Sequence, residues 1–99
     1  MPDPRIHPIK LVDDTFVTVG VVSTVVRLVT LNRAELDLVN DSAQTIYLGF
    51  GNAAVIGSGK RLNTQGGSYH MGPENLFYGT INAICVGGQA NLCVSEGTV

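Results

Sequence analysis

The chain has 99 residues, which fits one domain, and its net charge is −2. Apolar residues make up 44%, but only 14% are charged, against about 25% in an average domain. The six Lys and Arg residues are scattered, so the sequence lacks the basic cluster that nucleic-acid binding requires. So few charges are typical of a subunit that is covered by others in an oligomer or a capsid-like assembly. A monomer covered by Ser, Thr, Asn and Gln is the alternative.

Residues 1 to 14 are predicted to form an extended N-terminal arm. Three of the four prolines fall there, and proline lacks the amide hydrogen that a central strand donates. The start also lacks the positive end and apolar core of a signal peptide, so we expect synthesis in a cytoplasm. Four apolar side chains could anchor the arm on a partner, namely Ile6, Ile9, Leu11 and Val12. A frayed terminus is the alternative.

The next segments, 15–19 and 21–31, are rich in β-branched residues and predict strands that are broken or bent at Gly20. The apolar run from 16 to 31 is interrupted by glycine, serine, threonine and Arg27. A membrane-spanning helix needs about 20 clean apolar residues, so we expect no membrane association.

The segment 34–50 is predicted to be the central β-hairpin. Apolar and polar residues alternate over 34–38 and again over 45–50, which gives each strand one face for a core. The residues between them, Asn-Asp-Ser-Ala-Gln at 40–44, favour a turn.

The rest of the chain predicts further short strands with glycine-rich turns between them. Short strands are expected at 60–63 and 68–71, a long strand at 76–86, and a returning strand at 90–96 after a three-residue loop. About eight short strands and no helical periodicity predict a small antiparallel β-sandwich or jelly roll over 15–99. The predicted core contains Leu36, Leu38, Ile46, Leu48, Ile84, Leu92 and Val94.

The two cysteines, Cys85 and Cys93, would be diagonal neighbours across this last predicted hairpin. We expect reduced thiols because the protein is expected to be made in a cytoplasm, with a disulfide as the alternative. His7 and His70 have no nearby ligand set of the kind that zinc needs, so no metal or cofactor is predicted. A weak site built from both histidines and both cysteines is the remaining alternative.

Catalytic motifs are also missing, and we predict that the protein is not an enzyme. No nucleophile elbow is present, and the glycine-rich segments 49–52 and 57–61 neither lead into a helix nor have the P-loop spacing. Aromatic side chains could line a carbohydrate-binding platform, namely Tyr47, Tyr69, Tyr78 and Phe50. Glycan binding is therefore an alternative function.

Several longer motifs lie between residues 19 and 97. They include Val-Gly-Val-Val-Ser-Thr-Val-Val at 19–26, Val-Asn-Asp-Ser-Ala-Gln-Thr-Ile-Tyr-Leu-Gly-Phe-Gly at 39–51, Gly-Ser-Gly-Lys-Arg-Leu-Asn at 57–63 and Leu-Phe-Tyr-Gly-Thr-Ile-Asn-Ala-Ile at 76–84. With these motifs the chain resembles a family of small all-β proteins encoded by tailed phages and prophages. The resemblance covers about four-fifths of the chain and leaves out residues 1–14 and the cysteine pair.

The resemblance implies a structural protein of the virion and no catalytic residues. We expect a head decoration or cement protein that binds the major capsid protein or another virion protein. A tail- or neck-associated accessory protein, or a receptor- or glycan-binding module, is the alternative. A homotrimer is the favoured oligomer because three-fold positions are common on icosahedral shells.

Overall fold

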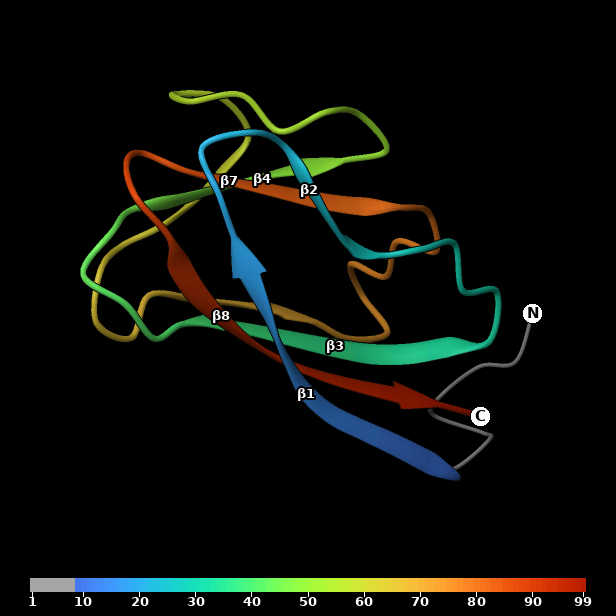
Figure 1. Cartoon of the computed structure of the whole chain (residues 1–99). Coiled ribbons are helices and arrows are strands. Elements are labelled where there is room, and N and C mark those ends of the chain that lie inside the picture. The colour runs from blue at the N-terminus through green and yellow to red at the C-terminus, as the bar shows by residue number, and fades with distance from the viewer. Residues whose placement is uncertain (1–8) are drawn as a thin grey trace.

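The computed structural model describes residues 9–99, and these contain eight strands and no helix (Figure 1). Consequently no described segment is a helix long and apolar enough to cross a membrane. The strands, in chain order, are β1 (Leu11–Val19), β2 (Thr24–Arg27), β3 (Arg33–Asn40), β4 (Ile46–Phe50), β5 (Lys60–Leu62), β6 (Ser68–Met71), β7 (Ile81–Cys85) and β8 (Ala90–Thr98).

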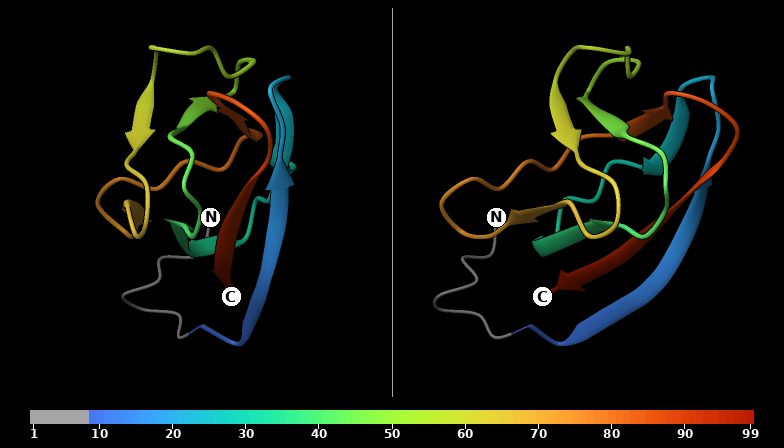
Figure 2. Two further views of the ribbon diagram at one scale, coloured as in Figure 1. Left: turned by 60° about the vertical axis from the view of Figure 1, so that its left-hand side comes forward. Right: turned by 90° about the vertical axis from the view of Figure 1, so that its left-hand side faces the viewer.

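The strands form two antiparallel four-stranded sheets that pack face to face (Figure 2). Sheet A has the order β1-β8-β3-β6, and sheet B has the order β2-β7-β4-β5. Only the connection from β4 to β5 stays within one sheet, and the other connections cross from one sheet to the other. This is the strand order of a jelly roll, so the predicted fold class is confirmed.

The core lies between the two sheets, where alternate residues of the strands point inward. Six of the seven predicted core residues are buried, but the prediction for Ile84 is wrong, because this residue is only half-buried. The register of β7 against β4 explains the error. Since Leu48 is buried and pairs with Ala83, Ala83 must also point inward, and Ile84 then pairs with Tyr47 on the outer face.

The predicted central hairpin is also wrong, although its strands and turn are in the right places. β3 belongs to sheet A and β4 to sheet B, so the 41–45 connection crosses between the sheets. The fully buried Asn40 holds this corner, because its Nδ2 donates to the carbonyl oxygens of Gln44 at 2.7 Å, Leu62 at 3.1 Å and Asn63 at 3.0 Å. These bonds turn the chain out of sheet A.

The last predicted hairpin is a crossing of the same kind, because β7 lies in sheet B and β8 in sheet A. Cys85 is buried between the sheets, whereas Cys93 lies opposite Phe16 of β1 and alternates with the buried Leu92 and Val94. The two cysteines are therefore not diagonal neighbours. Both are free thiols, as expected, but the packing that separates them was not foreseen.

The last four residues of the predicted arm, 1–14, are strand residues. Residues 11–14 belong to β1 and pair with residues 98–95 of β8, so these four residues are part of the domain. They belong to an edge strand, whose outward-facing backbone N–H and C=O groups have no partner strand. Residues 1–8, including Ile6 and His7, lie outside the described residues.

Candidate functional site

Exposed apolar side chains gather in the first third of the chain. Of the thirteen large hydrophobic residues that are exposed among residues 9–99, ten lie between Ile9 and Leu31. Val22 is 74% exposed, Leu11 is 72% exposed and Leu28 is 70% exposed. We call this surface the β1–β2 edge, and it consists of Ile9, Leu11, Val12, Phe16, Val21, Val22, Val25, Leu28, Val29 and Leu31.

These side chains lie on β1, on β2 and on the segments next to them, and the outer edges of both strands have no partner in the described part of the chain. β1 pairs only with β8, and β2 pairs only with β7. Both views in Figure 2 place β1 and β2 along the same side of the sandwich, with β5 and β6 on the opposite side. The same side therefore carries two open strand edges, which can pair with another chain, together with exposed apolar side chains.

Two acidic side chains at this edge have partners within the molecule. Asp13 of β1 accepts a hydrogen bond from Arg27 of β2 at 2.8 Å, and this ion pair joins the two edge strands across the sandwich. Asp14 accepts a hydrogen bond from the hydroxyl of Ser95 at 2.6 Å. Because these carboxylates already have partners, the edge is a better apolar docking surface than its sequence indicates.

A buried ion pair supports the loop that follows β2. The fully buried Arg33 donates from Nε to the Glu96 carboxylate at 2.5 Å. Its Nη atoms donate to the backbone carbonyls of Leu28 at 3.1 Å and Phe77 at 2.7 Å. The loop that carries Leu28, Val29 and Leu31 is thereby fixed to the rest of the domain.

Sequence reasoning missed this arginine. The sequence does contain an indication of the buried pair. Arg33 and Glu96 have opposite charges, and each lies in a strand whose inward-facing residues are otherwise mostly apolar. A register shift between Arg33 and Glu35 then turns the arginine inward. Its bond to the Phe77 carbonyl also explains why the strand predicted from residue 76 begins only at Ile81.

The predicted contact residues of the arm lie at the β1–β2 edge where they are described. Ile9, Leu11 and Val12 are exposed there, and Ile6 lies outside the described residues. Sequence reasoning did not identify the exposed apolar residues from Phe16 to Leu31 as part of the same surface. Runs of β-branched residues predict a strand but not whether it lies at an edge.

The predicted tyrosine platform is not assembled. Tyr47 alternates with the buried Ile46 and Leu48 and therefore lies on the outer face of sheet B. Tyr69 lies instead against Phe50, with ring centroids 5.4 Å apart, and is packed against the core. The two tyrosines therefore do not share a face, because Tyr69 lies on β6 of sheet A, opposite the buried Leu38.

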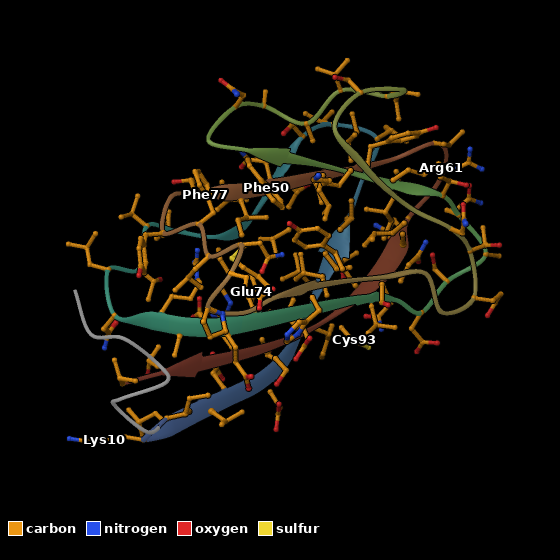
Figure 3. All side chains as sticks on the ribbon, turned by 180° about the vertical axis from the view of Figure 1, so that it is seen from behind. Lys10, Phe50, Arg61, Glu74, Phe77 and Cys93 are labelled. Atoms are coloured by element: carbon orange, nitrogen blue, oxygen red, sulfur yellow. The ribbon has the colours of Figure 1, made fainter. Side chains whose placement is uncertain are left out.

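Aromatic side chains do meet on the side opposite the β1–β2 edge. The ring of Phe50 stacks on Phe77 with centroids 5.6 Å apart, and both are labelled in Figure 3. The ammonium group of Lys60 lies 5.6 Å from the centre of the Tyr69 ring. These rings pack on one another and on the core, so they belong to the core and do not form an open binding platform.

No group of three or more His, Cys, Asp or Glu side chains within 9–99 is arranged to hold a metal ion. His70 instead pairs with Asp37 at 2.5 Å on the exposed outer face of sheet A. Comparisons with known proteins give no match to a family model, a curated protein or a solved structure. The resemblance to tailed-phage proteins therefore stays a prediction.

Proposed function

We propose that this protein is a structural protein of a tailed-phage virion, most specifically a head decoration or cement protein that binds the major capsid protein. The observation that carries the proposal is the β1–β2 edge, where ten exposed apolar residues lie on two strands with open edges and on the segments next to these strands. Exposed apolar patches bordered by open strands are typical of protein–protein contact sites.

The fold and the energetics support this assignment. Jelly rolls occur in viral capsid proteins as well as in lectins and cupins, so the fold supports the proposal by analogy. Burying one large apolar side chain contributes about 1.5 to 3 kcal/mol before the costs of association. A few side chains of the β1–β2 edge are therefore enough for stable binding to a shell.

Substitution of the most exposed residues tests this proposal. Val22→Lys and Leu28→Lys should each weaken binding to purified capsids by at least about tenfold, because a buried unpaired ammonium opposes association. Thr64→Lys is the control, since Thr64 is also exposed but lies in the β5–β6 connection, and β5 and β6 are on the opposite side of the sandwich. Binding can be measured by co-sedimentation with capsids that lack the protein. Equal binding by all three variants would exclude the β1–β2 edge as the contact.

The alternative functions can be distinguished from capsid decoration by experiment. A neck or tail protein would bind through the same edge to another virion protein, and its position and copy number in the particle would reveal this. A glycan-binding module would lose binding on glycan arrays after Tyr47→Ala or Tyr69→Ala. This last alternative has the weaker support, because the two tyrosines do not share a face.

A further inference from the structure

We infer that β1 binds an extended segment of the major capsid protein as an additional strand of sheet A, with a basic residue of that segment opposite Asp14. Apolar side chains of the segment then lie opposite Val12 and Phe16 on the same face. The inference rests on the proposed function, because it states which strand of the β1–β2 edge binds and what chemistry its partner has.

Four strands of the described chain have one open edge, and β1 is the one best suited to pairing with another chain (Figure 2). Its nine residues pair with β8 without a register shift, and residues 11–16 are exposed on both faces. β2 has four residues and a register shift between Val25 and Arg27, which is a feature that blocks pairing at an edge. β6 also has four residues, and β5 has three, two of them the exposed cations Lys60 and Arg61.

Carboxylates on the outer face of sheet A favour a basic partner at β1. Asp14 lies opposite Ser95 of β8, which in turn lies opposite Asp37 of β3. Glu35 lies in the next row, opposite Gly97. The strands of sheet A contain no lysine and one arginine, which is buried. The outer face beside β1 is therefore acidic.

Asp14 is the carboxylate of β1 that is left for a partner. Its hydrogen bond from the Ser95 hydroxyl leaves its charge uncompensated, and no lysine or arginine among residues 9–99 forms an ion pair with it. Asp13, on the other face of β1, is already paired with Arg27. A basic residue opposite Asp14 therefore adds an ion pair without breaking one.

The neighbours of Asp14 define the rest of the partner segment. An extended segment that adds to a sheet edge gains main-chain hydrogen bonds, and its alternate side chains provide specificity. Val12 is 57% exposed and Phe16 is 65% exposed, and both share the face of Asp14. Since residues directly opposite each other share a face, the matching segment has apolar, basic and apolar residues at every second position.

The same carboxylates disfavour a second copy of this chain as the partner. Antiparallel pairing of residues 11–16 with the same residues of a second copy sets Asp13 opposite Asp14 twice. Like charges directly opposite each other are destabilising. A segment of different sequence, with a cation at this position, fits the edge better.

Charge reversal in two peptides tests the pairing on the full chain without capsids. The first peptide, Thr-Val-Thr-Lys-Thr-Val-Thr, presents valine, lysine and valine on one face, and the second has glutamate in place of lysine. In an NMR titration the lysine peptide should shift the amide signals of residues 11–16. It should bind at least about tenfold more tightly than the glutamate peptide, because only the latter brings like charges together.

Variants of the protein complete this test. Asp14→Lys should reverse the preference between the two peptides, and Asp14→Asn, which only removes the charge, should weaken it. Asp41→Lys is the matched control, because it makes the same charge change at an exposed residue of the β3–β4 connection, and it should leave the preference unchanged. Thermal unfolding shows whether each variant is folded.

Several results would overturn the inference. They are no binding of the lysine peptide at millimolar concentration, equal binding of the two peptides, signal shifts confined to residues outside β1, and a preference that Asp14→Lys and Asp14→Asn leave unaltered.

Co-sedimentation with capsids separates this inference from the proposed function. Asp14→Lys should weaken capsid binding by at least about tenfold, and Asp41→Lys should not. Full capsid binding by Asp14→Lys, together with a loss of binding in Val22→Lys and Leu28→Lys, would overturn the strand pairing and leave the proposed function in place. Binding of the lysine peptide at β1 without any capsid binding would contradict the proposed function and still support a basic strand as the partner of β1.

Discussion

At the scale of single residues, the buried ion pair between Arg33 and Glu96 stabilises the loop after β2, which forms part of the β1–β2 edge. Arg33 is fully buried, and Glu96 is the one carboxylate with which it forms an ion pair within the described residues. Removing one partner of a buried ion pair leaves an uncompensated charge in a medium of low dielectric constant, which is costly.

We therefore predict that Glu96→Gln lowers the free energy of unfolding by about 3 to 5 kcal/mol. Asp13→Asn is the matched control, because the Asp13 carboxylate is 64% exposed. Removing this exposed ion pair should cost no more than about 1 kcal/mol. Urea denaturation measures both values. If Glu96→Gln were no more destabilising than Asp13→Asn, the buried pair would not support the edge.

At the scale of elements, the structure redefines which part of the N-terminus belongs to the domain. Residues 11–14 are strand residues that pair with β8, and Asp13 also binds Arg27 of β2. Their removal would expose the edge of β8 and break the link between the two sheets.

Two truncations separate the arm from the strand. If the folded domain begins at residue 9, deletion of residues 1–8 should change the free energy of unfolding by less than about 0.5 kcal/mol, the usual range for surface changes. Deletion of residues 1–14 should lower it by about 2 to 4 kcal/mol, because several ladder hydrogen bonds are lost. Thermal or urea unfolding of both proteins is the measurement. A large loss from the shorter deletion would show that residues 1–8 are part of the folded body.

The same elements show what the sequence could predict. Alternation of apolar and polar residues is a local property, so it correctly identified the inward residues Leu36, Leu38, Ile46 and Leu48. Alternation could not show whether β3 and β4 form a hairpin within one sheet or are joined by a connection between the two sheets, because a short polar turn fits both. The buried Asn40 decides it, through hydrogen bonds to Leu62 and Asn63, which are more than twenty residues away.

The candidate site was predicted only in part, for a similar reason. The apolar residues of the arm indicated contact residues at Ile9, Leu11 and Val12, which are indeed exposed. The larger contribution from Phe16 to Leu31 depends on β1 and β2 being the outermost strands of their sheets. That arrangement arises from the pairing of β1 with β8 and of β2 with β7, which are partners distant in the chain.

At the scale of the whole molecule, the two sides of the sandwich differ. Both sides end in strands with one open edge, β1 and β2 on one side and β5 and β6 on the other, but only the β1–β2 side also carries the cluster of exposed apolar side chains. This asymmetry gives the domain one side suited to association. The central claim is that the protein acts by binding other proteins through that side.

Hydrogen–deuterium exchange of the protein, free and bound to capsids, tests this claim most directly. Backbone amides at a new interface exchange more slowly because they gain partners or lose contact with water. We predict slower exchange in the bound state within residues 11–31 and no change in residues 60–71, which include β5 and β6. Slower exchange confined to residues 60–71, with residues 11–31 unchanged, would contradict the account.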